Sequence, residues 1–328
     1  MTKSELCAGY HKRFPNLPTR TLAKKIYDEN KLMFSNFDSC RSALRYVRDE
    51  KGELLRGYKS KYKVDASNKI RVEDLPQECG DSYERYYIKN SKVLIISDLH
   101  FPYQDNKAIA AALNKGLEEN VNCVFINGDL LDFAQISRHE RDWRQRTVYE
   151  EFEAVRQFLQ LLRKKFPKAT IVFKEGNHDE RWEKWLFLKA PEIFDDPEFK
   201  LETRLRLGEL GIDIVKDKRP VQIGKLTCLH GHEFIGGGSG GVNPARSTFL
   251  KTLDSVVVGH YHKSSQHIET TMNGNTISVT SLGSLCNLNP HYARINKWNH
   301  GFAIVDHDIK TGEYQLTNYK IINGKIYI

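Results

Sequence analysis

The sequence predicts an α/β fold in which buried strands alternate with helices. The first observation is a series of short apolar runs bounded by polar residues, of which 93–96 and 123–126 are the clearest; such runs are typical of strands buried on both faces. The second is a pair of amphipathic stretches, 106–119 and 147–165, which separate these runs as helices would. The third is that polar residues directly follow the strands, where α/β sheets place their chemistry.

Size and composition are those of an ordinary globular protein. The chain has 328 residues, of which 40% are hydrophobic and 28% charged. No apolar run reaches the roughly 18 residues that a membrane helix needs, and the stretch 1–13 is too polar for a signal peptide. We therefore expect a soluble cytoplasmic protein without a membrane partner. The six cysteines are scattered without a Cys-x-x-Cys pair, which favours reduced thiols over a disulfide framework or a structural zinc site. The sequence gives no indication of oligomeric state.

The positive charge is concentrated near the N-terminus. Residues 1–66 hold 15 Lys and Arg against 8 Asp and Glu, which accounts for +7 of the net charge of +8. Helical spacing predicts one helix from about 19 to 30, with Thr19 as its N-cap, and a second from 36–38 to about 51. The second helix carries three arginines on its polar face, Arg41, Arg45 and Arg48.

Two interpretations of this basic segment stay open. Two short helices joined by a turn, the second one basic, resemble a helix-turn-helix, in which the second helix enters the major groove of DNA. A solvated basic face on a small helical cap explains the same pattern. We assign residues 1–56 to a basic helical module, 57–90 to a connector and 91–328 to the main domain.

The main domain continues after its first two strands with a third at 169–173, which completes a strand–helix–strand–helix–strand order. Helix-poor segments follow. We expect these to form a second sheet packed against the first, from 224–229, 255–258, 276–280, 302–305 and a hairpin-like pair around Asn323 and Gly324.

Five of the expected strands end in polar blocks. Asp98 and His100 follow the first strand, and because they are two residues apart in extended backbone, both can face one point. The other blocks are Gly128-Asp129-Leu130-Leu131-Asp132, Gly176-Asn177-His178-Asp179, His230-Gly231-His232 and Gly259-His260-Tyr261-His262. Since neighbouring strand ends lie close together, these groups can converge on one site. The glycines before the ligands permit close backbone approach.

These blocks, present in order from Asp98 to His262, resemble the motifs of the calcineurin-like metallophosphoesterase superfamily. The resemblance covers the last three quarters of the chain and implies a four-layer αββα sandwich with two metal ions bridged by Asp129. It implies two ligand sets, one of Asp98, His100 and His262 and the other of Asn177, His230 and His260. His232 replaces His230 as a ligand if the register of that strand end is shifted by two residues.

Carboxylate, amide and imidazole ligands without thiolate are suited to two divalent ions, with Mn²⁺ the first expectation and Fe or Zn the alternatives. A carboxylate bridge such as Asp129 offsets part of the repulsion between two cations. The resemblance makes His178 the group that stabilises or protonates the leaving oxygen. We expect Asp132 to orient the His178 imidazole.

Arg181 and Arg246, close in sequence to these blocks, are candidates for holding phosphate oxygens. The glycine-rich stretch 236–241 is expected to be a lid, a phosphate cradle or a plain loop. A phosphate-ester substrate follows from the resemblance, and the basic module favours DNA or RNA, hydrolysed by a nuclease or phosphodiesterase. The alternatives are a phosphatase or phosphodiesterase acting on nucleotides or phosphoproteins, and a non-catalytic DNA-binding regulator. The appended basic module also resembles enzymes carried by bacteriophages.

Overall fold

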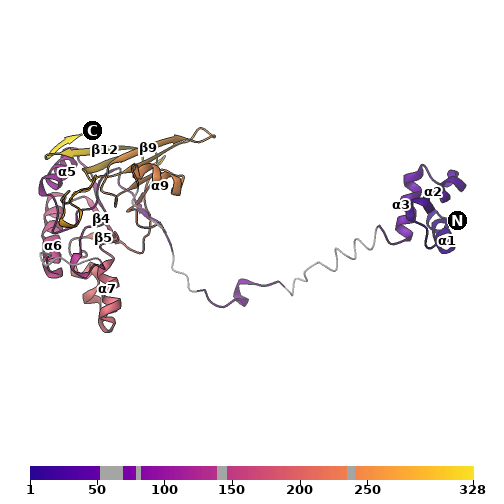
Figure 1. Ribbon diagram of the computed structural model, residues 1–328, viewed down its shortest axis with the longest axis horizontal. Helices are drawn as coiled ribbons and strands as arrows, with labels where there is room; N and C mark the ends of the chain where they lie inside the picture. The colour runs from indigo at the N-terminus through magenta and orange to yellow at the C-terminus, as the bar shows by residue number, and fades with distance from the viewer. Residues whose placement is uncertain (52–68, 79–82, 139–145, 235–240) are drawn as a thin grey trace. The chain divides into compact units, whose positions relative to one another are not determined.

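The computed structural model describes residues 1–51, 69–78, 83–138, 146–234 and 241–328 (Figure 1). The chain divides into two compact units, Met1–Asp81 and Ser82–Ile328. Of the helices in the described ranges, none is long and apolar enough to cross a membrane.

The N-terminal unit is a bundle of three helices around a small apolar core. Its elements are α1 (Lys3–Arg13), α2 (Thr19–Glu29), the short η1 (Lys31–Met33), α3 (Phe37–Val47) and, further along the chain, η3 (Val72–Asp74). Leu22 and Ile26 of α2 pack against Leu44 of α3, all fully buried. The predicted N-cap is wrong by one residue, because Thr19 is already helical and Pro18 precedes it without a side-chain cap. Asn36 does cap α3, since its side chain accepts a hydrogen bond from the Ser39 amide at 2.8 Å.

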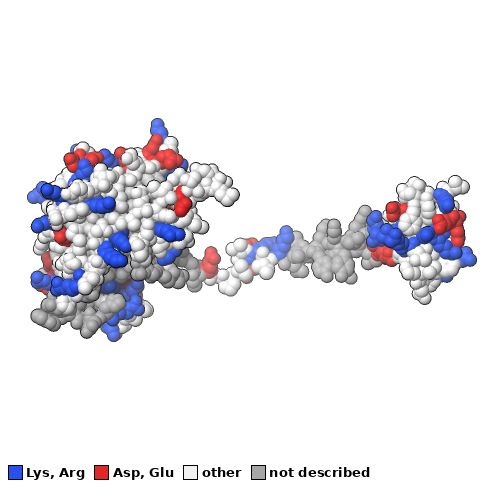
Figure 2. Space-filling model, turned by 45° about the horizontal axis from the view of Figure 1, so that its top comes forward, with Lys and Arg blue, Asp and Glu red and all other residues white. Residues whose placement is uncertain are grey.

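The three arginines predicted to form the basic face are partly paired with other groups of the same unit. Arg48 donates to the Thr19 hydroxyl at 3.0 Å and lies within 3.4 Å of the Phe14 and Pro15 carbonyls, so it ties the end of α3 to the loop before α2. Arg41 and Arg45 lie 3.9 Å from Asp38 and 3.8 Å from Glu50, respectively. On the face seen in Figure 2, acidic side chains lie among the basic ones.

The C-terminal unit is built on a seven-stranded sheet in the order β13-β12-β11-β2-β3-β4-β5. Strands β2 to β5 run parallel and β11 to β13 extend the sheet antiparallel from β2. The strands are β2 (Lys92–Ile96), β3 (Cys123–Asn127), β4 (Thr170–Lys174), β5 (Ile212–Val215), β11 (His300–His307), β12 (Tyr314–Ile322) and β13 (Lys325–Tyr327).

A second sheet of six strands has the order β1-β6-β7-β8-β10-β9. Its strands are β1 (Tyr86–Ile88), β6 (Val221–Ile223), β7 (Leu226–Leu229), β8 (Val256–Val258), β9 (Ser265–Thr270) and β10 (Thr276–Ser281). Because β1 pairs with β6, the range predicted as a connector includes a strand of this sheet.

Alternation along β2 shows why its apolar run is continuous. Val93 and Ile95 face the core between the two sheets, whereas Leu94 and Ile96 face the core under the helices. The first sheet is therefore covered on both sides, which requires apolar residues at every position.

Helices complete the outer layers on the two sheets (Figure 1). The apolar core under the first sheet includes Phe152 and Leu159 from α6, and that of the second includes Ala245 from α9. The remaining elements are α5 (Asn106–Glu118), η4 (Ala134–Ile136), α6 (Val148–Lys165), α7 (Arg181–Lys189), η5 (Pro191–Ile193), η6 (Pro197–Phe199), α8 (Leu201–Arg204), α9 (Pro244–Thr252) and η7 (His291–Ala293). The predicted αββα sandwich is confirmed.

One expectation about the sheets is wrong. The segment 302–305 and the C-terminal hairpin do not join the second sheet, because β11 pairs antiparallel with β2, placing Val305 opposite Val93. A parallel sheet can accept antiparallel strands at a free edge, and the short, continuous apolar run 302–305 of β11 does not specify which sheet it joins. The glycine-rich stretch 236–241 lies outside the described residues except for Gly241.

Candidate metal centre

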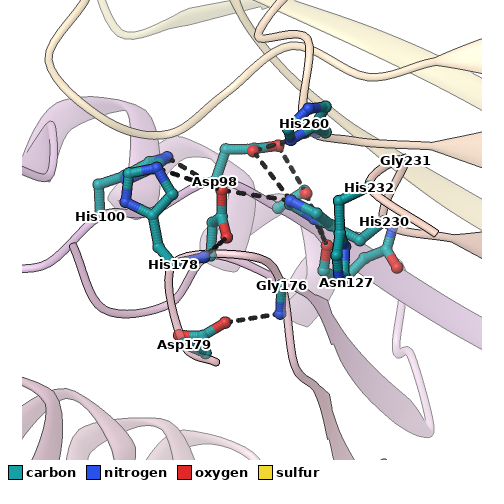
Figure 3. Close-up of polar contacts among 12 residues, drawn as sticks. Asp98, His100, Asn127, Gly176, His178, Asp179, His230, Gly231, His232 and His260 are labelled. Atoms are coloured by element: carbon teal, nitrogen blue, oxygen red, sulfur yellow. Dashed lines mark hydrogen bonds and ion pairs between the residues drawn. The ribbon is translucent and has the colours of Figure 1, made fainter. Parts of the chain in front are cut away.

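The polar blocks at the strand ends converge on one buried site (Figure 3). The loops after β2, β3, β4, β7 and β8 supply the five blocks, so both sheets contribute. Asp98 and His230 are fully buried, while His100 and Asp129 are almost so. Unpaired charge is costly at such depth, so these side chains must be paired with one another or bind cations.

Asp129 lies at the centre of the site. It groups within ligand-binding reach with Asp98 and His100 on one side and with His230 and His260 on the other. Its Oδ2 atom lies 3.2 Å from His230 Nε2 and 3.6 Å from His100 Nε2. One carboxylate common to both groups is the arrangement that a bridging ligand of two cations requires.

The first ligand group consists of Asp98, His100 and His262. His262 Nε2 lies 3.2 Å from Asp98 Oδ1 and 3.1 Å from His100 Nε2, so the two ring nitrogens and the carboxylate face one point. Asp98 also accepts the His260 amide, at 3.0 Å to Oδ1 and 2.9 Å to Oδ2. The block after β8 is thereby tied to the block after β2.

The second predicted ligand group consists of Asn177, His230 and His260, of which His230 and His260 group with Asp129 within ligand-binding reach. The His230 ring is held by a 2.8 Å hydrogen bond between Nδ1 and the Asn127 carbonyl, which leaves Nε2 pointing to Asp129. Among the described residues, Asn177 Oδ1 is buried without a hydrogen-bond partner, and His230 Nε2 faces the Asp129 carboxylate at 3.2 Å without a hydrogen bond of good geometry. Buried polar atoms are almost always satisfied, so two such atoms at one site fit the role of metal ligands.

His230, rather than His232, belongs to this second group. His232 Nε2 lies 2.9 Å from Glu180 Oε1 in a separate ion pair, and the group that Asp129 forms with His230 and His260 does not include His232. The structure therefore fits the register in which His230, and not His232, is the predicted ligand.

Two glycines allow the blocks to approach closely. A Cβ atom on Gly176 would lie 2.2 Å from Asp129 Oδ1, and one on Gly259 would lie 2.1 Å from Ser97 Oγ. Any side chain at either position would displace the ligands themselves. The backbone of Asp98, His100 and Asp129 is left-handed, with φ of 56°, 50° and 52°. Such conformations are uncommon outside glycine and are often found at functional sites.

Asp179 holds the second and third blocks together. Its carboxylate accepts hydrogen bonds from the Leu131 amide at 2.9 Å and the Gly176 amide at 2.8 Å. Burial and the nearby Asp129 raise the pKa of Asp179 to about 7. Its position directly after His178 was visible in the sequence, but its contact with the block after β3 was not.

The charges of the site are balanced by the histidines. Burial opposes ionisation of Asp98, but the positive His262 and His230 lower the pKa of Asp98 to about 2. Burial opposes protonation of His230, but Asp129 raises the pKa of His230 to about 10. The buried carboxylates are therefore stable as anions only beside positive charge. In this structure protonated histidines provide that charge, and divalent cations would provide it in their place, with the histidines losing their protons. The donor set and this charge demand fit two divalent metal ions.

His178 and Asp132 lie beside the first group. His178 Nδ1 is 2.9 Å from the Asp132 carbonyl, and its amide donates to Asp129 Oδ1 at 2.9 Å. Asp132 Oδ1 is 2.9 Å from His100 Nδ1 and 3.3 Å from His178 Nδ1. Asp132 therefore contacts a predicted ligand as well as His178, a link that the sequence did not indicate.

The two predicted phosphate-binding arginines are placed differently. Arg181 donates to the Asp132 carbonyl at 2.8 Å, and its Nη2 lies 3.0 Å from His178 Nε2. Arg246 is exposed in the first turn of α9, where its amide is capped by Asn243. The structure therefore brings Arg181 into contact with the site residues.

Cys286 is a contact that sequence reasoning missed. Its buried Sγ lies 3.7 Å from His262 Nδ1, and it groups with His100 and His262 within ligand-binding reach. No motif surrounds it in the sequence, so only the fold could reveal it. Trp298 also packs on His262, with ring centroids 4.2 Å apart.

Comparison with known proteins gives a family match. The model of the calcineurin-like phosphoesterase family matches residues 91–275. The Gene 54 protein of Mycobacterium phage L5 is 25% identical over 237 residues, covering 67% of this chain and 90% of that protein. The Gene 54 protein of Mycobacterium phage D29 is 26% identical over 183 residues, covering 53% and 70%.

Solved structures of lower identity also match. A single mutant of Vps29 from Entamoeba histolytica is 16% identical with a TM-score of 0.37, covering 72% of this chain and 96% of that one. The phosphoesterase Yfce from E. coli is 15% identical with a TM-score of 0.33, covering 69% and 98%.

Proposed function

Because the chain belongs to the calcineurin-like phosphoesterase family and is a metal-dependent phosphoester hydrolase, we propose that it hydrolyses phosphodiester bonds of nucleic acid. The observation that supports the site is the single carboxylate of Asp129 shared by two ligand groups. The support for nucleic acid is the charge of residues 1–66, where 15 basic residues stand against 8 acidic ones.

In this proposal two Mn²⁺ ions are held by the first and second ligand groups around Asp129. Bound there, the ions would supply a deprotonated water and neutralise charge on the phosphate. Oxygen and imidazole donors accommodate Mn²⁺, and Fe and Zn are the alternatives for the same donors.

His178 and Arg181 would act on the substrate directly. The Asp132 carbonyl accepts the proton of His178 Nδ1, so Nε2 is the free nitrogen, and in the structure it accepts from Arg181. An arriving phosphate oxygen offers Arg181 a stronger, charged acceptor. Once Arg181 turns to the phosphate, His178 Nε2 is free to hold a proton for the leaving oxygen.

The N-terminal unit would keep nucleic acid near the site. A tethered basic module raises the local substrate concentration without reading sequence. We propose that residues 1–56 serve this purpose, joined through the segment that follows, in a protein active in the cytoplasm of a phage-infected cell. The helix-turn-helix interpretation is one way for this unit to bind.

A metal-dependent assay on the full chain tests the proposal. With Mn²⁺, we expect cleavage of a model diester and of oligonucleotides, and complete loss in Asp129→Asn with its folded circular dichroism spectrum retained. Removing residues 1–66 should weaken nucleic-acid binding and flatten its salt dependence, while cleavage of the model diester persists. Activity confined to monoesters, nucleotides or phosphoproteins would contradict the nucleic-acid proposal, and binding unchanged by truncation would contradict the role of the N-terminal unit.

A further inference from the structure

A pocket of about 470 Å³ opens beside the second ligand group. Asn177 is one of its lining residues, so the pocket adjoins the candidate metal centre. Four of its lining residues are basic, namely Arg138, Arg181, Lys184 and Lys189. Among the described residues that line it, none is acidic. A concave surface of one charge sign next to a hydrolytic centre favours an anionic ligand.

One face of helix α7 forms the wall of this pocket. Arg181, Lys184, Trp185, Leu188 and Lys189 follow the spacing i, i+3, i+4, i+7 and i+8, which places them on one side of a helix. The opposite side is anchored in the core through the buried Trp182 and Leu186. At about 1.5 Å per residue this face spans about 12 Å, the length of three to four stacked nucleotides at about 3.4 Å each.

The four cations that line the pocket, Arg138 from the segment after η4 and three from α7, are available to a ligand to different degrees. Arg138 and Lys189 are exposed, and Lys184 is exposed but forms an ion pair with Glu180. Arg181 uses the neutral Asp132 carbonyl and His178 as partners, so no carboxylate neutralises its charge through these contacts. Arg138, Arg181 and Lys189 therefore keep their positive charge at the pocket, whereas Glu180 offsets that of Lys184.

Trp185 adds an aromatic surface within this basic row. It is half-buried and stacks on the buried Trp182, with ring centroids 5.9 Å apart and an interplanar angle of 16°. The stack fixes the orientation of the Trp185 ring, so little entropy is lost when a ligand binds to it. Basic side chains interleaved with an ordered aromatic ring are the common features of surfaces that bind single strands of nucleic acid.

We propose that the α7 face binds the single strand that flanks the scissile phosphate, with Arg138 and Lys189 on successive phosphates and Trp185 stacked on a base. This inference rests on the proposed function, since it assigns a path to the strand that the metal centre cleaves. It predicts a preference for single-stranded ends over intact duplex, because a paired base cannot stack on Trp185 without unpairing.

The test compares a single-stranded decanucleotide with a small diester, bis-p-nitrophenyl phosphate, on full-length protein with Mn²⁺. In Arg138→Gln/Lys189→Gln we expect KM for the oligonucleotide to rise about tenfold, and the slope of log affinity against log salt to fall by about 0.7 per charge. Trp185→Leu should weaken oligonucleotide binding by about tenfold. The kinetics of the small diester should not change in either variant, which also shows that the variants fold.

Lys164→Gln on α6 is the matched control, since Lys164 is exposed and does not line the pocket. If wild type cleaves the oligonucleotide and the α7 variants behave like this control, the strand path is wrong while the proposed function stands. If the α7 variants lose activity on the oligonucleotide and on the small diester equally, the α7 face supports the fold and does not bind the strand. If wild type cleaves the small diester but no oligonucleotide, the proposed nucleic-acid function fails and the inference fails with it.

Discussion

The two ligand groups around Asp129 are held in different ways. In the first group, side chains contact the outer nitrogen of each histidine, Asp132 at 2.9 Å from His100 Nδ1 and Cys286 at 3.7 Å from His262 Nδ1. In the second group, His230 is held by the Asn127 carbonyl at 2.8 Å. The ring orientations in the first group therefore depend on side chains that a mutation can remove, whereas that of His230 depends on a backbone carbonyl of β3.

The groups also differ in what they face. His100 and His262 are at most 5% exposed, and both lie among protein side chains. Asn177, by contrast, lines the pocket along α7, and its Oδ1 has no hydrogen-bond partner in the part of the chain that the structure describes. The second group therefore reaches the pocket through Asn177, although its His230 is as deeply buried as the histidines of the first group.

Among the residues that contact the predicted ligands without being ligands themselves, the largest effect should come from Asp132, which lies against both His100 and His178. In Asp132→Asn the negative charge beside both histidines is lost, and partners of this kind typically contribute about 10- to 100-fold to metal affinity or activity. We expect activity to fall about 100-fold and Mn²⁺ affinity about tenfold, measured by diester hydrolysis during a metal titration. Asp195→Asn, an exposed aspartate, is the matched control. Unchanged metal affinity would show that the first group does not depend on this side chain.

A smaller effect is expected from Cys286, which contacts the other histidine of the first group. Cys286→Ala removes the partner of His262 Nδ1, and we expect Mn²⁺ affinity to fall by up to about tenfold. Cys286→Ser, which restores a hydrogen-bonding atom, should recover most of that loss. Cys123→Ala controls for the loss of a buried thiol, since Cys123 lies in the core between the sheets. If the alanine variants of Cys286 and Cys123 retain equal metal affinity, Cys286 only fills space.

The sequence was sufficient to predict the parts of the site that follow from local pattern. The run 93–96 was predictable as a strand because it is continuously apolar. Asp98 and His100 were expected to face one point through extended backbone; they do meet at the site, but the backbone at both residues is left-handed. Parallel strands then brought their ends together, so Asp129 and His178 were predictable from their positions after β3 and β4.

The parts that could not be predicted depend on long-range packing. Cys286 reaches His262 only through the loop after β10, and nothing in its flanking residues distinguishes it from the buried Cys123. The basic row of α7 has an ordinary helical pattern, and only its position beside Asn177 relates it to the metal centre. The sheet joined by β11 was mispredicted for the same reason, because a short, continuous apolar run fits either sheet.

The smallest effect is expected at His232, two residues from His230 and the other candidate ligand of that strand end. His232 pairs with Glu180 at 2.9 Å, so His232→Gln should lose one ion pair and change Mn²⁺ affinity by less than about threefold, a fraction of a kcal/mol. His230→Gln should abolish binding to the second group, because it removes the nitrogen facing Asp129. Metal stoichiometry measured by mass spectrometry of the native protein separates the two variants. If His232→Gln lost one metal ion and His230→Gln retained both, His232 would be the ligand and the register of β7 would be shifted. The ligand histidine of the second group would then be held by the Glu180 side chain and not by the backbone of β3.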